Sequence, residues 1–250
     1  MPFADSTHIK VPDGIPDEKL LFLSDIFPTG WQAAVQCDIG PSDTVAVWGC
    51  GPVGQFTIRS AMLLGAGRVV AIDNGKTAGY RLKMAADAGA ITIDNRSDDV
   101  YDRLMDISGG IGPDVCIDAV GMEAHGSNPI ETVYDRIKTN LMLETERPAA
   151  VRQTIECCRP GGTVSIPGVY GGLADKIPLG ALMNKGLTIK TGQTHVHRFV
   201  PELLDHVRKG KIDPSFVVTH RIPLSQAPHG YDIFREKKDN CVKVVLDPAA

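Results

Sequence analysis

The sequence predicts an α/β protein built on a doubly wound, six-stranded parallel sheet. Three observations carry this prediction: a glycine-rich turn between an apolar run and a helical pattern, an acidic residue at the end of the next apolar run, and a long alternation of apolar runs with helical patterns. Runs that are apolar almost throughout are typical of parallel strands covered by helices on both faces.

The glycine-rich turn is Gly49-Cys50-Gly51-Pro52-Val53-Gly54, which follows the apolar run Thr44–Trp48 and precedes a helical pattern over Gln55–Leu64. A second apolar run, Arg68–Ile72, ends in Asp73. Strand, glycine turn, helix, strand and acid in this order and spacing are typical of the βαβ unit of Rossmann dinucleotide-binding domains.

Each residue of this unit has a physical role. Gly49 allows a sharp turn, Gly51 leaves room for a pyrophosphate beside the backbone, and Gly54 lets the helix pack closely on the sheet. Pro52 suits the first helical turn, where its missing N–H costs nothing, and the free N–H groups at the helix start bind phosphates. We expect Asp73 to accept hydrogen bonds from the adenosine ribose hydroxyls, which favours NAD over NADP because a carboxylate repels a 2′-phosphate.

Two other interpretations of the turn stay open at this point. One is a tight strand–helix turn in another α/β fold, and the acid downstream counts against it. The other is a methyltransferase that binds S-adenosylmethionine, because that class also uses a glycine turn and a ribose-binding acid.

The alternation continues from Asp43 to about Thr191 and supplies the rest of the sheet. The expected strands are Val45–Trp48, Val69–Ile72, Ile91–Ile93, Val115–Val120, Thr163–Ile166 and Leu187–Lys190. Further helices are expected at Ala78–Asp87, Asp99–Ser108, Ala149–Cys158 and Pro201–Lys209, each of which stops near glycine. Gly121–Arg147 is too long for a simple crossover; it starts at the carboxyl end of the fourth strand, so it either covers the cofactor or is a surface excursion.

The two ends of the chain fall outside this sheet. Residues 1–40 combine a strand-like start with a helix over Thr29–Cys37, and residues 216–250 predict a strand (Phe216–Thr219), a helix (Ser225–Lys237) and a strand (Cys241–Leu246). We therefore expect an NAD-binding domain at 41–215, with 1–40 and 216–250 as remnants of a second, incomplete domain.

Composition narrows the function classes. A chain of 250 residues with a net charge of −4 and scattered basic residues gives no reason to expect nucleic acid or an anionic membrane as partner. No apolar run is long enough to span a bilayer, and Met1–Gly14 has no features of a secretory signal. Six cysteines without a CxxC pair indicate buried thiols in a reducing compartment, so a cytoplasmic protein is expected.

Three further stretches join Thr44–Gly54 in a family pattern: Leu21–Gly30, Gly161–Tyr170, and Thr219–Leu224 with Lys243–Leu246. Together they resemble the zinc-dependent alcohol dehydrogenases of the medium-chain superfamily, in particular the glutathione-independent formaldehyde dehydrogenase branch. The resemblance covers nearly all of the chain. It implies a Rossmann domain, NAD as cofactor, and hydride transfer between nicotinamide and a small alcohol or aldehyde. It also disfavours the methyltransferase.

The resemblance has one large gap. Members of the family begin with a β-rich catalytic domain that carries most of the zinc ligands, and this chain has no counterpart to it. Asp25 matches a position that supplies one catalytic zinc ligand, and Asp25 and Thr29 are the candidate catalytic residues. A catalytic zinc normally needs three protein ligands, so zinc is doubtful. One hypothesis is that Asp25 and His195 or His197 hold a weakly bound metal, since an extended HxH pair would share one face.

Other candidate cofactor-binding residues lie at the ends of strands four, five and six. In addition to Gly49, Gly51, Pro52, Val53, Gly54 and Asp73, they are Val120, Pro167, Val169, Gly192 and Thr194. His125, in the long insertion, matches a cofactor contact of the formaldehyde dehydrogenase branch by resemblance.

The chain is also expected to associate. The family resembles proteins that dimerise by joining their sheets edge to edge at strand six. Faces of the terminal segments that carry Phe216, Ile222, Tyr231 and Phe234 should be exposed and partly apolar, which usually attracts partners. We therefore predict a homodimer or larger. The alternative to an active oxidoreductase is a non-catalytic NAD(H)-binding module.

Overall fold

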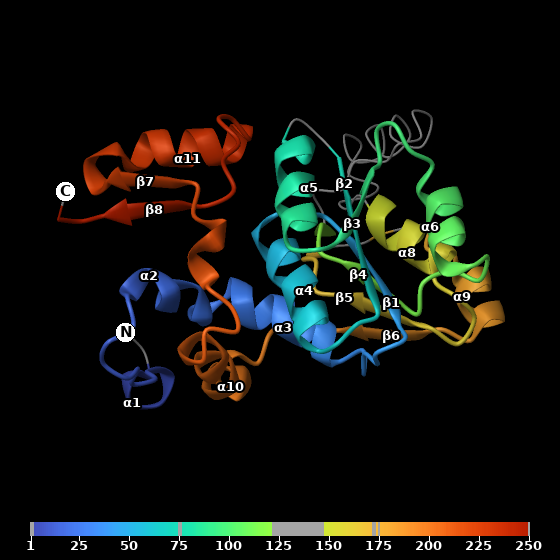
Figure 1. Ribbon diagram of the computed structural model, residues 1–250, viewed down its shortest axis with the longest axis horizontal. Coiled ribbons are helices and arrows are strands. Elements are labelled where there is room, and N and C mark those ends of the chain that lie inside the picture. The colour runs from blue at the N-terminus through green and yellow to red at the C-terminus, as the bar shows by residue number, and fades with distance from the viewer. Residues whose placement is uncertain (1–2, 75–76, 122–147, 172–173, 175, 250) are drawn as a thin grey trace.

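The computed structural model describes residues 3–74, 77–121, 148–171, 174 and 176–249. Within this part of the chain, six parallel strands form one sheet in the order β3-β2-β1-β4-β5-β6, and two more parallel strands form a separate small sheet (Figure 1). The large sheet consists of β1 (Thr44–Trp48), β2 (Arg68–Asp73), β3 (Ile91–Asp94), β4 (Val115–Asp118), β5 (Thr163–Ile166) and β6 (Thr188–Thr191). The predicted fold class is confirmed.

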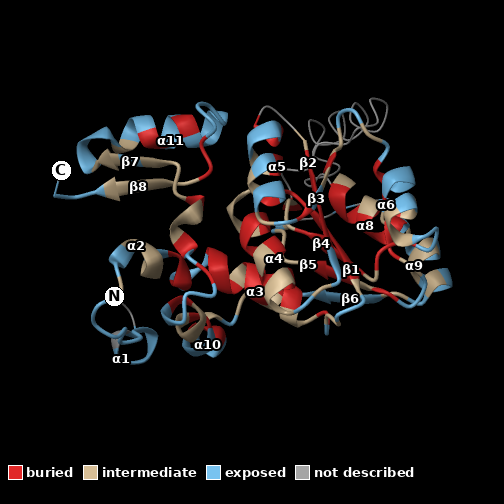
Figure 2. Ribbon diagram, in the orientation of Figure 1, coloured by how far each residue is buried: buried red, intermediate tan, exposed pale blue. Residues whose placement is uncertain are grey.

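Helices cover both faces of the large sheet. One face carries α3 (Ile26–Val35), α4 (Pro52–Leu63) and α5 (Ala78–Asp87), and the other carries α6 (Val100–Ser108), α8 (Ala149–Cys157) and the short α9 (Leu179–Lys185). β1 shows why its run is apolar throughout: Val45 and Val47 pack under the first set of helices, whereas Ala46 and Trp48 pack under the second. Figure 2 shows the strands at the centre as the most deeply buried part of the chain.

A third hydrophobic cluster joins both ends of the chain to α4. The Phe27 ring of α3 stacks on the Phe56 ring of α4 with centroids 4.8 Å apart. A Cβ on Gly30 would lie 2.6 Å from the Thr57 nitrogen, so glycine permits the close approach of the two helices. Phe216 also packs edge-on against Phe56, at 5.0 Å. The expectation that Phe216 is exposed was therefore wrong, because α4 covers its ring.

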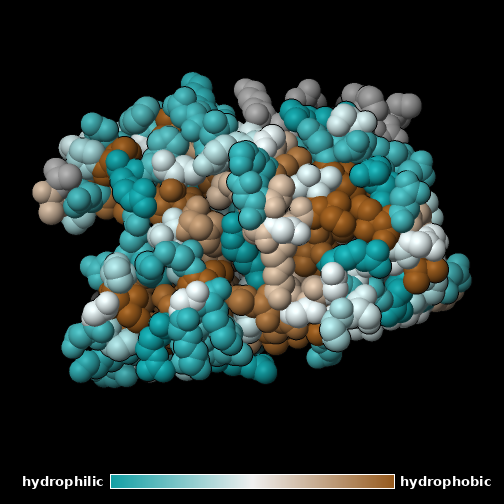
Figure 3. All heavy atoms as spheres, viewed as in Figure 1, coloured by the Kyte–Doolittle hydropathy of each residue, from teal (hydrophilic) through white to brown (hydrophobic). Residues whose placement is uncertain are grey.

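The remaining α-helices and strands lie in the terminal segments 1–40 and 216–250, except for α10, which precedes the second of them. They are α1 (Ala4–Thr7), α2 (Asp17–Leu20), α10 (Val196–Arg208), α11 (Ala227–Glu236), β7 (His220–Pro223) and β8 (Val244–Asp247). Helix α11 lies against β7 and β8, where Gly230 faces Ile222 and Val244. Tyr231 and Phe234 on α11 are exposed, as expected, whereas Ile222 is half-buried. Figure 3 shows a hollow between this α11–β7–β8 unit and the segment of α1 and α2, with hydrophobic atoms on both sides.

Three predictions for the terminal segments differ from the structure. In the described part of residues 1–40 the strand-like start is replaced by the short helices α1 and α2. The strand expected at Phe216–Thr219 is a 3₁₀ helix over Pro214–Val217, because Pro214 suits a first helical position and the Asp213 side chain caps the Ser215 N–H at 3.1 Å; β7 starts later. The last strand also lies further along the chain than Cys241–Leu246.

All six cysteines are buried and free, in agreement with the expectation of small core residues. Among the described residues, no helix has the length and apolar character needed to cross a bilayer. The domain boundaries at 40/41 and 215/216 remain predictions.

Candidate functional site

The candidate site lies where the parallel strands end. The register places Trp48 level with Ile72 and Asp118, and Ile166 level with Thr191. The loops that follow these strands therefore meet at one edge of the sheet, which is where open α/β sheets bind ligands. Most of the candidate cofactor-binding residues are located in these loops.

The glycine turn has the geometry that its sequence predicts. Gly49 has φ +88°, which a side chain rarely adopts, and its N–H continues the ladder to the Ile72 oxygen at 2.8 Å. A Cβ on Gly54 would lie 1.8 Å from the Gly49 oxygen. A side chain at Gly54 would therefore force α4 away from the turn.

Gly51 differs from these two glycines because nothing lies within 4 Å of the Cβ that it lacks. It precedes Pro52, the first residue of α4, and Val53 follows on the half-buried side of the helix start. The first turn of α4 thus presents free backbone N–H groups beside open space. The turn fits a diphosphate group, which binds to such N–H groups and to the positive end of the helix dipole.

Asp73 ends β2 and is 7% exposed. Its carboxylate accepts a hydrogen bond from the backbone N–H of Asn74 at 2.9 Å. It also forms an ion pair with Arg81 of α5, in which Nε lies 2.6 Å from Oδ2 and Nη2 lies 3.0 Å from Oδ1. Burial raises the pKa of the Asp73 carboxyl, and the Arg81 guanidinium opposes this shift. The carboxylate is therefore fixed in orientation before any ribose reaches it.

Arg81 is a residue that the sequence analysis missed. The available signal was a basic residue near the start of the helix that follows the acid. Its pairing with Asp73 could not be read from spacing alone, because the pairing depends on the direction in which α5 leaves the end of β2.

Asp118 at the end of β4 was also missed. It is fully buried, and its carboxylate accepts from the Tyr170 hydroxyl at 2.7 Å and from the N–H groups of Val120 and Gly121 at 2.9 and 3.2 Å. Burial raises the pKa of this carboxyl, whereas these hydrogen bonds lower it. Asp118 thereby ties the loop after β4 to the loop after β5.

The loops after β4 and β5 are in close contact with each other and with the glycine turn. A Cβ on Gly121 would lie 2.6 Å from the Val169 nitrogen, and a Cβ on Gly49 would lie 2.7 Å from a Val120 methyl group. Pro167 is half-buried and Val169 is 60% exposed. The structure therefore brings Val120 and Val169 to the same edge as the turn.

At the end of β6 the structure brings the candidate catalytic residues to a candidate cofactor residue. Thr29 Oγ1 donates to the Asp25 carbonyl oxygen at 2.8 Å, lies 3.2 Å from Asp25 Oδ1, and accepts from Thr194 Oγ1 at 3.1 Å. Gln32 of α3 also binds this segment, since its amide oxygen accepts from the His195 N–H at 3.0 Å. Gly192, with φ +132°, is exposed beside them.

The metal hypothesis gains no support from this arrangement. Among the described residues, no three His, Cys, Asp or Glu side chains are grouped so that they could hold a metal ion. His195 precedes α10 and His197 lies within it, because α10 starts at Val196 and carries Pro201 inside the helix. The expectation of an extended HxH pair was wrong, since the chain is helical from Val196 onward and His197 lies in the first turn of α10. His125 and the insertion at 122–147 lie outside the described residues.

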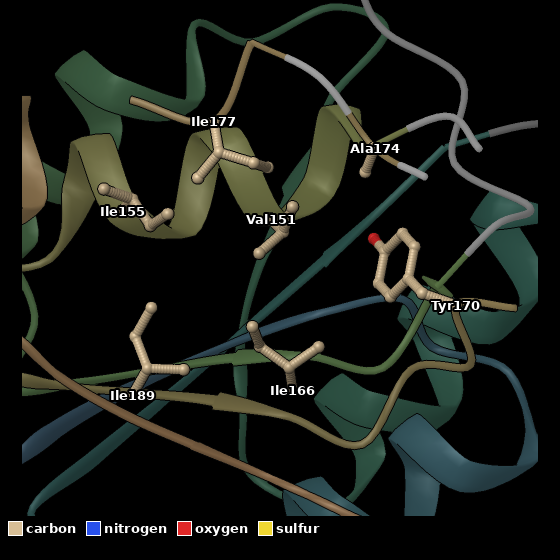
Figure 4. A pocket seen from close by; sticks show the side chains of 7 residues that line it. All are labelled: Val151, Ile155, Ile166, Tyr170, Ala174, Ile177 and Ile189. Carbon is tan, nitrogen blue, oxygen red and sulfur yellow. The ribbon is translucent and has the colours of Figure 1, made fainter. Parts of the chain in front are cut away.

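An apolar cavity opens between α8 and the last two strands (Figure 4). Val151 and Ile155 line it from α8, Ile166 from β5 and Ile189 from β6, and the Tyr170 ring closes one end. The chain thus carries an apolar surface beside the outer edge of the sheet as well as the polar site at the strand ends.

The chain is similar in sequence to zinc-type alcohol dehydrogenases. Residues 52–136 match the family described as zinc-binding dehydrogenase. The chain is 40% identical over 252 residues to an uncharacterized zinc-type alcohol dehydrogenase-like protein of Bacillus subtilis strain 168, covering 99% of this chain and 64% of that protein. It is 32% identical to a glutathione-independent formaldehyde dehydrogenase of the same organism, covering 99% of this chain and 61% of that one. The chain spans less than two thirds of the length of either relative.

Solved structures show the same likeness. An alcohol dehydrogenase from Thermus sp. ATN1 matches with a TM-score of 0.77 at 32% identity, covering 95% of this chain and 60% of that chain. A protein of E. coli CFT073, described as a short chain alcohol dehydrogenase complexed with cofactor NADH, matches with a TM-score of 0.75 at 19% identity, covering 95% and 61%. At that lower identity the likeness shows the fold alone.

Proposed function

Because this chain belongs to the zinc-type alcohol dehydrogenases of the zinc-binding dehydrogenase family, we propose that it binds NAD at the strand ends and serves hydride transfer involving a small alcohol or aldehyde. The observation that carries the proposal is the glycine turn, in which two glycines are excluded from carrying a side chain and the third, Gly51, borders open space at the start of α4.

The adenosine diphosphate half of NAD would be held by groups that are already in place. The backbone N–H groups at the start of α4 bind the diphosphate, and Asp73 accepts hydrogen bonds from the adenosine ribose hydroxyls. Arg81 holds the Asp73 carboxylate on two atoms, so little side-chain freedom is lost when the ribose binds.

The nicotinamide half would lie toward the ends of β5 and β6. When bound, NAD supplies the hydride acceptor for alcohol oxidation. Val169 offers an exposed apolar surface to the ring, while the linked hydroxyls of Thr29 and Thr194 offer hydrogen bonds that orient polar groups of the cofactor or substrate. Asp25 anchors Thr29 through its carbonyl oxygen.

Zinc does not fit the described residues in the same way, because Asp25 has no group of partners there that could complete a ligand set. No step is therefore assigned to zinc. The same observation favours a second candidate function, a non-catalytic NAD(H)-binding module that uses the adenosine diphosphate half of the site alone.

Two measurements test these functions. Calorimetric titration with NADH should show saturable binding, whereas S-adenosylmethionine should give no heat; absence of NADH binding overturns the proposal. In a second assay, NADH absorbance is followed after addition of NAD with ethanol or formaldehyde, and NADH formation supports the oxidoreductase. Binding without turnover, before and after addition of zinc, supports the non-catalytic module.

The proposal extends to a second copy of the chain as partner. β6 is the last strand of its sheet, its four residues are all exposed, and Leu179 and Met183 of α9 are exposed nearby. An unpaired edge of this kind can pair with another strand. Light scattering should report a dimer for the unaltered chain and a monomer for Ile189→Lys, with Ile111→Lys, another exposed apolar position, as the matched control. A monomer before any substitution contradicts this interface.

A further inference from the structure

Gln55 is a fully buried, uncharged polar side chain beside the proposed site, and the cofactor itself would not touch it. It follows Gly54 in α4 and is 0% exposed. Its Nε2 donates to the Cys50 carbonyl oxygen at 3.2 Å and to the Arg81 carbonyl oxygen at 2.8 Å. Its Oε1 accepts from Arg59 Nη1 at 2.8 Å. Both N–H donors and the oxygen of the amide therefore have partners.

These partners fix which way the amide faces. Two carbonyl oxygens can only accept hydrogen bonds, so they require the NH₂ group, and a guanidinium can only donate, so it requires the oxygen. The Arg59 guanidinium is itself held, since it lies 3.6 Å above the Phe216 ring and donates to the Met84 oxygen. Burial keeps water from replacing any of these bonds, which makes each of them costly to lose.

The contacts of Gln55 join the two halves of the adenosine diphosphate site. Cys50 belongs to the glycine turn, where the diphosphate would lie. Arg81 belongs to α5, and its guanidinium holds the Asp73 carboxylate with distances of 2.6 and 3.0 Å. One side chain thus connects the backbone of the turn to the backbone of the residue that orients the ribose-binding carboxylate.

We propose that Gln55 is a positioning residue that sets the separation between the glycine turn and the Asp73–Arg81 pair. This inference rests on the proposed binding of NAD. With Gln55 in place, the diphosphate and the ribose hydroxyls meet their partners at the same time. Without its two donated bonds, α5 shifts relative to the turn, and the ribose contact is lost while the diphosphate contact remains.

The test compares two ligands in each protein, NADH and its analogue that lacks the adenosine 2′-hydroxyl. In the unaltered chain the analogue should bind about tenfold more weakly, because it lacks a hydrogen bond to a charged acceptor. Gln55→Met keeps the side-chain volume but not the hydrogen bonds. In this variant the affinity for NADH should fall by about the same factor, and the difference in affinity between the two ligands should disappear. If Gln55 had a merely structural role, its substitution would lower the affinity for both ligands equally and leave the tenfold ratio intact.

Two further variants serve as a second test and as a control. Gln55→Glu keeps the acceptor for Arg59 but loses both donors, so it should behave as Gln55→Met does, which covers the case in which the Met variant does not fold. Ser60→Ala removes a different buried polar group of α4, the Ser60 hydroxyl, and should keep the tenfold ratio. If the unaltered chain shows the ratio and both Gln55 variants retain it, the inference is overturned while the proposed function stands. If the unaltered chain binds no NADH, both are overturned.

Discussion

The two ends of the proposed cofactor site are built differently. At the adenosine diphosphate end, Asp73 is 7% exposed and its carboxylate is paired with Arg81, and two of the three glycines are in contact with backbone atoms. At the nicotinamide end, Asp25 and Gly192 are exposed, and the hydroxyls of Thr29 and Thr194 are joined to one another, with Thr29 also bonded to the carbonyl oxygen and carboxylate of the exposed Asp25.

This difference indicates which functions depend on the core of the fold. The first end uses groups that also hold β2, α4 and α5 together, so substitutions there should affect stability and binding at once. The second end uses groups on the surface of the core, so substitutions there should affect function with little change in stability. Matched pairs of substitutions test whether the two ends differ in this way.

The largest difference is expected between the two aspartates. Asp73→Ala removes the partner of the buried Arg81 guanidinium and should lower the free energy of unfolding by about 3 kcal/mol. Asp25→Ala changes an exposed side chain and should lower it by less than about 0.5 kcal/mol. Urea unfolding of both variants measures this. Equal losses would show that the two ends do not differ in the way described.

Substitution of two glycines of the same turn should have a smaller effect on stability. One substitution should lower stability, and the other should weaken only NADH binding. Gly54→Ala places a Cβ 1.8 Å from the Gly49 oxygen and should cost about 2 kcal/mol of stability through overpacking. Gly51→Ala, with φ −66° and open space, should leave the melting temperature unchanged but weaken NADH binding about tenfold, since the methyl group occupies the space of the diphosphate. Unchanged binding in Gly51→Ala would place the diphosphate elsewhere.

The smallest effect is a dependence on pH that belongs to the first end alone. Burial raises the pKa of Asp73 above its ordinary 3.8, and the ionised form accepts the ribose hydrogen bonds. NADH affinity should therefore fall as the pH is lowered through a midpoint above 3.8. Over the same interval the folded chain binds more protons than the unfolded chain, so the contribution of Asp73 to stability decreases as the pH rises.

Calorimetry across a pH series checks this prediction. Asp73→Asn should bind NADH more weakly at neutral pH and show a flatter profile, whereas Asp25→Asn should follow the unaltered chain. A profile that Asp73→Asn leaves unchanged would assign the titration to another group.

The terminal segments show where sequence patterns fail. The strand expected at Phe216–Thr219 rested on a short apolar run, and such a run does not distinguish a strand from a helical turn that packs one side on a core. Here Phe216 packs on Phe56, more than a hundred residues earlier in the chain. The start of α10 was misplaced for a related reason, since Pro201 resembled a helix start but lies inside a helix that begins at Val196.

The sequence by itself determined the succession of six parallel strands along the chain, the glycine turn and the acid at the end of β2, because these depend on local backbone freedom and on burial patterns that repeat within a few residues. Only the tertiary structure decided that Arg81 holds Asp73, that Gln55 ties the turn to α5, and that Thr194 meets Thr29. Those contacts join side chains across elements, and their geometry depends on how helices lie on the sheet, which no local pattern fixes.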